Sequence, residues 1–147
     1  MDFSELTIKK MKISDYDALI KLWNEAGLPY RPKGRDRKEK ITKELENPNA
    51  IFLVAVFREE IIGSIFGTHD GRKGWINRLA ISPPHRKLGL AQKMIEEVEK
   101  KLTELGIEII ACMIEDWNNS SMKLFEKVGY IRHPDIFYFT KRYNPDV

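Results

Sequence analysis

Residues 75–114 combine a strand, a sharp turn, a long amphipathic helix and a second strand, in that order. Pro83 and Pro84 end the first strand, because proline lacks the N–H group that a central strand needs. Apolar residues that recur every three or four positions predict a helix over residues 91–105, and Gly106 ends it. Residues 107–114 are rich in β-branched side chains and predict the second strand. This succession predicts an α/β domain with a mixed sheet.

The rest of the chain adds strands and helices to this unit. The expected elements are an edge strand at residues 6–12, a helix capped by Ser14 and ended by Gly27, a second helix that stops before Pro48, a hairpin of strands at 50–57 and 61–68, and a short helix from Asn118 or Asn119 to Gly129. One or two final strands are expected at Ile131 and at residues 136–141. With 147 residues and no interior linker, we expect a single domain spanning residues 1–147.

The composition excludes several classes of protein. The longest apolar run, residues 50–57, is far shorter than the stretch of about 18 residues that a membrane span needs. No apolar stretch precedes the first charges, so no secretory signal is expected and the expected location is cytoplasmic. The single cysteine, Cys112, excludes an internal disulfide. The histidines are scattered without ligand spacing, so no metal site is predicted.

Positive charge is concentrated in residues 31–43. The whole chain has 25 basic and 22 acidic residues, an excess too mild to indicate a nucleic-acid binder. Residues 31–43 alone hold seven basic and two acidic side chains. Such a run is either the solvated face of a helix or a surface with a binding role, and both interpretations stay open.

The turn between the first strand and the long helix has the chemistry of an anion site. The first N–H groups of a helix lack internal partners and lie at its positive end, where they bind phosphate if the backbone can approach closely. Gly89 and Ala91 leave the backbone accessible, and Arg86 and Lys87 add positive charge. The turn therefore predicts a pyrophosphate site or, alternatively, an ordinary strand–helix connection.

Two sequence blocks resemble one known family. Arg86-Lys87-Leu88-Gly89-Leu90-Ala91 resembles the R/Q-x-x-G-x-G/A signature of the GNAT superfamily of acetyl-CoA-dependent N-acetyltransferases. Further downstream, the block from Asn118 to Tyr130 is similar to the family's N-x-x-[AS]-x-x-L-[YF]-x-x-x-G-[FY] pattern. The resemblance implies a mixed, mostly antiparallel sheet of six to seven strands, splayed in the middle, with about four helices.

The resemblance also implies a site for acetyl-CoA as co-substrate. Backbone N–H groups of the turn would hold the pyrophosphate, and the end of the preceding strand would bond the pantetheine arm through its backbone. The acetyl thioester would lie in the gap between this strand and the strand at 107–114. Asn118 matches a position that commonly contacts the coenzyme, and it also suits a helix N-cap. The residues expected to bind the coenzyme are Leu79, Ala80, Ile81, Arg86, Lys87, Leu88, Gly89, Leu90, Ala91, Gln92 and Asn118.

The reaction implied by the resemblance is direct transfer of the acetyl group to an amine in a ternary complex. The backbone N–H near Leu79 is a candidate to polarise the thioester carbonyl. Many relatives carry a tyrosine acid where this chain has Phe125, and some carry a glutamate base where it has Met113. Neither replacement can move a proton. Glu115 is the candidate replacement base, since alternate residues of a strand share a face; alternatively it is a surface carboxylate.

The acceptor that the resemblance implies is a primary amine of a small molecule, peptide or protein. By resemblance, its pocket lies between residues 28–35 and the last strands, at residues 136–141. Tyr30, Arg31 and Arg35 are candidates to bind an acidic or carboxylate-bearing amine, and Tyr138 is a candidate for the opposite wall. Two other functions stay open: a coenzyme A-binding regulatory module with weak or no activity, and a nucleic-acid-associated protein that uses the basic helix. The apolar residues 136–139 fit either a homodimer edge or a final core strand.

Overall fold

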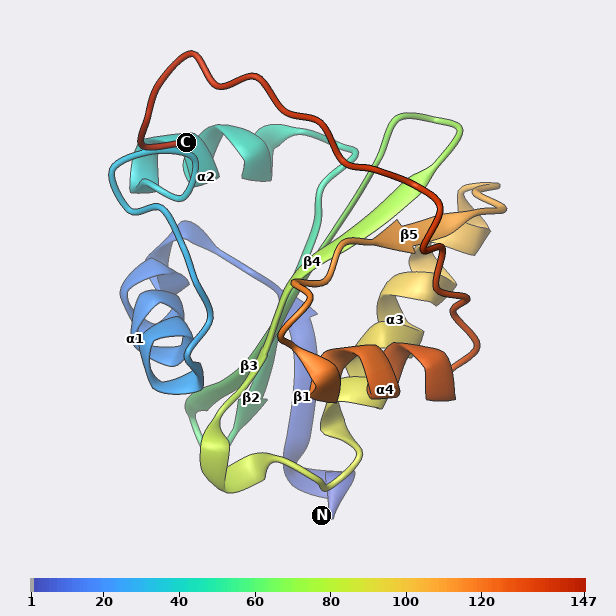
Figure 1. Ribbon diagram of the computed structural model, residues 1–147. Helices are drawn as coiled ribbons and strands as arrows, with labels where there is room; N and C mark the ends of the chain where they lie inside the picture. Colours follow the sequence, from blue (N-terminus) through green and yellow to red (C-terminus); the bar gives the residue numbers. More distant parts are fainter. Residues whose placement is uncertain (1) are drawn as a thin grey trace.

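The computed structural model describes residues 2–147, and in this part of the chain it contains five strands and four α-helices (Figure 1). In chain order the elements are β1 (Leu6–Lys10), α1 (Tyr16–Ala26), α2 (Lys38–Glu46), β2 (Ile51–Phe57), β3 (Glu60–His69), β4 (Gly74–Ile81), α3 (Leu90–Glu104), β5 (Ile110–Cys112) and α4 (Asn119–Lys127). Short 3-10 turns precede β1 and α1 and follow β4. The expected order of strands and helices is confirmed as far as α4.

The five strands form one sheet in the order β1-β2-β3-β4-β5. The first four strands are antiparallel neighbours, whereas β4 and β5 are parallel because α3 carries the chain back between them. The pairing of β4 with β5 covers only Gly74 to Ile76 against Ile110 to Cys112. The second half of β4 therefore leaves its edge open on the side of β5, and the candidate site lies at this opening.

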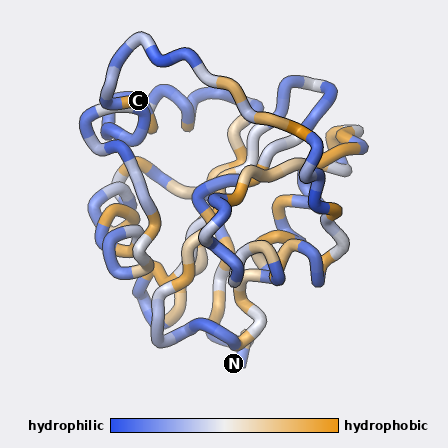
Figure 2. The backbone as a smooth tube through the Cα atoms, viewed as in Figure 1, coloured by the Kyte–Doolittle hydropathy of each residue, from blue (hydrophilic) through white to orange (hydrophobic). Residues whose placement is uncertain are grey.

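Helices cover both faces of the sheet, with α1 and α2 on one side and α3 and α4 on the other (Figure 1). Alternate side chains of β2 point to opposite faces of the sheet. Leu53 packs in the core beneath α3, and Phe52 and Val54 pack with Trp23 of α1. Because both faces are covered, β2 is apolar along its length rather than alternating. Figure 2 shows mostly hydrophilic residues along α2.

The sequence-based prediction is wrong for the C-terminal residues. In the described part of the chain no strand follows α4, and residues 136–141 have no sheet partner. Phe137 and Phe139 are 80% and 89% exposed. An alternating pattern predicts two faces, but a strand also needs a neighbouring backbone. Here the segment crosses toward α2 (Figure 1), and the backbone of Asp146 lies against Gly34. The sheet therefore has five strands and not six to seven.

Two further boundaries differ from the prediction. Ser14 lies within the 3-10 turn Ile13–Asp15, and Asp15 occupies the N-cap position of α1 without a capping hydrogen bond from its side chain. The strand expected at residues 107–114 is shorter, because only Ile110–Cys112 has a partner in β4. Among the described residues, none of the helices is both long and apolar enough to cross a membrane.

Candidate functional site

The turn from β4 into α3 exposes the amides that begin the helix. Lys87 and Gly89 both have positive φ, 62° and 86°, so the chain reverses tightly before α3 starts at Leu90. Lys93 N donates to Gly89 O at 3.2 Å, which closes the first turn of the helix. The amides of the three residues between them have no carbonyl of the helix to bind. They form the positive end of α3, which has the chemistry to bind phosphate oxygens.

Arg86 holds this turn in place through two carbonyl groups. Its Nε donates to Ile81 O at 3.1 Å, and its Nη2 donates to Ala26 O at 2.8 Å. The guanidinium therefore joins the end of β4 to the end of α1. Lys87 is exposed beside it and supplies positive charge to the same region. Arg86 thus contributes structure as well as charge, which the motif alone does not show.

A cavity of about 750 Å³ lies between this turn, the end of α1 and the start of α4. Its lining includes all of the predicted coenzyme-binding residues except Leu88, whose side chain is 41% exposed and lies outside the lining. These lining residues are Leu79, Ala80, Ile81, Arg86, Lys87, Gly89, Leu90, Ala91, Gln92 and Asn118. The fold therefore gathers the end of β4, the turn and the start of α4 around one space.

Strand β4 contains a bulge at the point where it leaves β5. Ser64 and Phe66 of β3 pair with Ala80 and Asn77, so two residues of β4 lie opposite one residue of β3. Beyond the bulge, Ser82 N donates to Ile62 O of β3 at 2.8 Å. Alternate residues of a strand direct their backbone groups to opposite neighbours. The backbone of Leu79 therefore faces the opening between β4 and β5.

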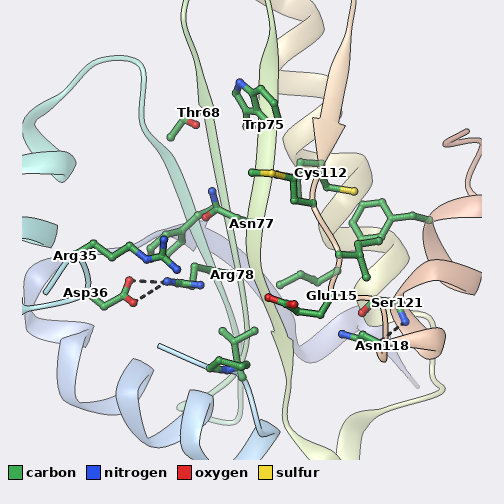
Figure 3. A pocket seen from close by; sticks show the side chains of 18 of the residues that line it. Arg35, Asp36, Thr68, Trp75, Asn77, Arg78, Cys112, Glu115, Asn118 and Ser121 are labelled. Carbon is green, nitrogen blue, oxygen red and sulfur yellow. Dashed lines mark hydrogen bonds and ion pairs between the residues drawn. The ribbon is translucent and has the colours of Figure 1, made fainter. Parts of the chain in front are cut away.

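A second cavity, of about 500 Å³, lies on the other side of this opening (Figure 3). The two cavities share six lining residues, among them Leu79 from β4 and Asn118 from the start of α4. The shared wall brings the two spaces together beside the bulge. A long substrate that enters from the turn and a second substrate that enters from the far side would therefore meet at Leu79.

Asn118 lies where the two cavities meet and also caps α4. Its Oδ1 accepts a hydrogen bond from Ser121 N at 3.2 Å, so the predicted N-cap role is confirmed. The side chain is half-buried and lines both cavities. The cap holds the start of α4 against the opening (Figure 3).

Residues just after β5 form one wall of the second cavity. Met113 and Glu115 both line it although β5 ends at Cys112, and the Glu115 carboxylate is directed into the opening toward β4 (Figure 3). Phe125 lines the same cavity and is 5% exposed. Among these side chains, Glu115 alone can accept a proton, because Met113 and Phe125 carry no titratable group.

Two titratable groups of this cavity have shifted pKa values. Burial raises the pKa of the Cys112 thiol to about 11, so the thiol is protonated and a poor nucleophile at neutral pH. The pKa of Glu44 is raised by partial removal of its carboxyl from water at the cavity wall, and further by the nearby charge of Asp36. Cys112 therefore lines the cavity as a neutral thiol.

Only some of the predicted acceptor-binding residues line the second cavity. Tyr138 lines the second cavity, as does Arg35 from the basic run. Tyr30 and Arg31 lie outside this lining: the Tyr30 hydroxyl donates to Asn24 Oδ1 at 2.9 Å, and Arg31 N donates to Asp36 Oδ2 at 2.7 Å. The basic run thus places one of its arginines at the cavity.

The sequence analysis missed an ion pair at the same wall. Asp36 and Arg78 are joined by a 2.7 Å bond between Oδ2 and Nη2, with side chains 7% and 14% exposed. The two residues are far apart in the chain and stand in no motif, so no sequence signal pairs them. Within residues 2–147 no cluster of three or more histidine, cysteine, aspartate or glutamate side chains is arranged to hold a metal ion.

Comparison with known sequences gives one consistent result. The model of the acetyltransferase (GNAT) family matches residues 16–130. An acetyltransferase of Sodalis glossinidius is 31% identical over 137 residues, which cover 93% of this chain and 95% of that protein. An acetyltransferase of Pectobacterium atrosepticum is 33% identical over 125 residues, which cover 85% of this chain and 87% of that protein.

Solved structures share the fold at low sequence identity. The PaiA N-acetyltransferase of Thermoplasma acidophilum, in complex with coenzyme A, matches with a TM-score of 0.75 and 22% identity over 84% of this chain and 88% of its own. The aminoglycoside N-acetyltransferase AAC(6′)-Iy, in complex with the bisubstrate analogue CoA-S-monomethyl-acetylneamine, matches with a TM-score of 0.78 and 18% identity over 95% and 99% of the two chains.

Proposed function

The chain belongs to the GNAT family of acetyltransferases, and from this premise we propose that it transfers an acetyl group directly from acetyl-CoA to a primary amine within a ternary complex. The acceptor is a small molecule, a peptide or a protein. The observation that carries the proposal is the meeting of two cavities at Leu79 and Asn118. One cavity has the anion-binding turn, and the other has Glu115 in its wall.

The proposed position of acetyl-CoA follows the open edge of β4. The amides of Leu90, Ala91 and Gln92 hold the pyrophosphate at the positive end of α3. The pantetheine arm adds to the edge that β5 leaves unpaired beyond Ile76, in the manner of an extra strand. This path brings the thioester to the junction of the two cavities.

In the proposed reaction the amine nitrogen attacks the thioester carbonyl carbon, a C–N bond forms and the C–S bond breaks. The Leu79 N–H stabilises the negative charge that develops on the carbonyl oxygen. Glu115 accepts the proton that the attacking nitrogen loses, directly or through a water molecule. Since an ordinary thiol has a pKa near 8.5, releasing coenzyme A as a bare thiolate at pH 7 costs only about 2 kcal/mol. Replacement of an acid by Phe125 is therefore compatible with turnover.

We further propose that the acceptor carries a carboxylate or another anionic group. Support comes from Arg35, which lines the acceptor cavity together with Tyr138. Neutralising Arg31, Lys33 and Arg35 together should raise the KM for such an acceptor. The single variants Arg35→Gln and Lys33→Gln then show which side chain causes the rise in KM. Arg35→Gln should raise it and Lys33→Gln should not, because Arg35 lines the cavity and Lys33 lies outside the lining. An unchanged KM in the triple variant would remove the anionic group from the proposal.

The test is to titrate acetyl-CoA into the purified protein by calorimetry and then to screen pools of amines for release of free thiol. Binding together with amine-dependent thiol release supports the proposal. Absence of acetyl-CoA binding overturns it.

The second candidate is a coenzyme A-binding regulatory module. Met113 and Phe125 favour it, because they stand where many relatives have proton-transfer groups. Binding of acetyl-CoA without turnover over a broad panel of amines, each at millimolar concentration, would establish this alternative.

A further inference from the structure

Ser64 is a completely buried serine in the middle of the apolar strand β3. Its hydroxyl donates to the backbone carbonyl of Arg78 at 2.8 Å and accepts a hydrogen bond from Trp23 Nε1 at 3.0 Å. Packing alone would be satisfied by an apolar side chain at this position. The hydroxyl instead links α1 to the bulge of β4.

The carbonyl that Ser64 holds belongs to the same peptide unit as the Leu79 N–H. This unit is planar and trans, so the C=O of Arg78 and the N–H of Leu79 point in opposite directions. Ser64 draws the carbonyl toward β3, and the N–H is thereby directed away from β3 into the opening where the two cavities meet. The orientation of the proposed oxyanion donor is therefore set by a side chain that lines neither cavity.

The side chain of Arg78 supplies a second constraint on the same residue. Arg78 has φ +54°, a left-handed conformation that is unfavourable for a residue with a Cβ and needs support from its surroundings. The Arg78 guanidinium binds Asp36 through Nη2 at 2.7 Å and Nε at 3.2 Å. Asp36 is itself held, since its backbone carbonyl accepts from the Tyr16 hydroxyl at 2.7 Å.

We propose that Ser64, supported by Trp23, and Asp36, acting through Arg78, are positioning residues that aim the Leu79 N–H at the thioester carbonyl oxygen. This inference rests on the proposed function. Two linked hydrogen bonds, from Trp23 Nε1–H to the Ser64 hydroxyl and from that hydroxyl to the Arg78 carbonyl, also polarise the peptide unit between Arg78 and Leu79, because linked hydrogen bonds strengthen one another. The Leu79 N–H becomes a better donor as well as a fixed one.

The test measures the thioester carbonyl itself and needs no acceptor. The infrared stretch of ¹³C-carbonyl-labelled acetyl-CoA is recorded free and bound. In the wild type, bound acetyl-CoA should absorb at lower frequency than the free molecule, because the Leu79 N–H polarises its carbonyl. In Ser64→Ala the frequency should return at least half-way to the free value. Its Kd for acetyl-CoA should stay within about threefold, since the amides at the start of α3 are unchanged.

Turnover and a control separate positioning from general stability. With any amine that the wild type acetylates, Ser64→Ala should lower kcat about tenfold or more, as expected for an impaired oxyanion donor. Tyr130→Phe removes another partly buried hydrogen bond, from the Tyr130 hydroxyl to Glu99, and should leave the carbonyl frequency at the wild-type value. If Ser64→Ala does not fold, Ser64→Cys replaces it, because a thiol is of similar size and a weak donor. Asp36→Asn tests the second constraint, which is the ion pair between Asp36 and Arg78.

The outcomes distinguish the two proposals. A wild-type frequency shift that persists in Ser64→Ala, or in Ser64→Cys, overturns the positioning role and leaves the proposed function intact. A wild type that binds acetyl-CoA without a shift overturns the role of Leu79 and the positioning role with it. A wild type that does not bind acetyl-CoA overturns the proposed function itself.

Discussion

Arg86 and Ala26 are joined across the cavity of about 750 Å³ by a hydrogen bond of 2.8 Å from the Arg86 Nη2 to the Ala26 carbonyl oxygen. Both residues line this cavity. The last turn of α1 has carbonyl groups without partners in the helix, and this guanidinium satisfies one of them. With its second bond to Ile81, Arg86 fixes the distance between the two walls of the cavity.

Arg86→Lys should therefore weaken acetyl-CoA binding about tenfold at low and at high salt, because an ammonium group cannot reproduce the planar fork that serves two carbonyls. Lys87→Gln should weaken binding less, and its effect should fade in 0.5 M salt, because it removes only a solvent-exposed charge. Calorimetric titrations at two salt concentrations measure both. A defect in Arg86→Lys that disappears in high salt would contradict the structural role.

Gly89→Ala should weaken acetyl-CoA binding at least tenfold and lower the free energy of unfolding by about 1 kcal/mol, because Gly89 has φ +86°, which a residue with a Cβ rarely adopts, so the substitution strains the turn that presents the amides. Gly106→Ala is the matched control. Gly106 has φ +84° and open space around its Cα, and it lies outside both cavities. The control should show a similar loss of stability in urea and unchanged affinity. Equal affinities for the two variants would place the pyrophosphate elsewhere.

Glu115→Gln should lower turnover at least tenfold and shift the pH–rate profile, because it removes the proton acceptor that faces the opening. Asp116→Asn is the control, since the neighbouring carboxylate lines neither cavity. Steady-state rates with one amine across a pH series separate the two. A Glu115→Gln enzyme with the wild-type profile would exclude Glu115 from proton transfer.

Cys112 should be alkylated slowly by iodoacetamide at pH 8 in the folded protein. With the pKa of its thiol raised to about 11, the thiolate is scarce at that pH, and the rate should rise as the pH approaches 11. In urea the thiol returns to its ordinary pKa, and the rate at pH 8 should increase roughly a hundredfold. Mass spectrometry of timed samples measures both rates. Fast labelling of the folded chain would show an accessible thiolate.

The turn between β4 and α3 could be predicted from local sequence. Pro83, Pro84 and Gly89 act within a few residues of themselves, so the turn and the start of α3 follow from short-range backbone preferences. The family match confirms the resemblance that these residues suggested. The N-cap at Asn118 is local in the same sense.

The acceptor half could not be predicted in the same way. Tyr30 and Arg31 were expected at the acceptor, but they lie outside the cavity lining, where the Tyr30 hydroxyl donates to Asn24 and the Arg31 backbone N–H donates to Asp36. The strand expected at residues 136–141 does not form, because alternation of apolar residues does not specify which strand of the sheet would pair with it. Whether an alternating segment becomes a strand depends on a partner from a distant part of the chain.

The amino-acid sequence by itself determined the order of elements up to α4, the turn between β4 and α3, and the family, because each depends on neighbours in the chain. Only the tertiary structure decided that Ser64, Trp23 and Asp36 converge on Arg78, and so how the Leu79 N–H is directed. These contacts join residues 14 to 42 positions apart. Such contacts arise when α1 and the turn before α2 pack against the sheet, and no periodicity or local motif encodes them.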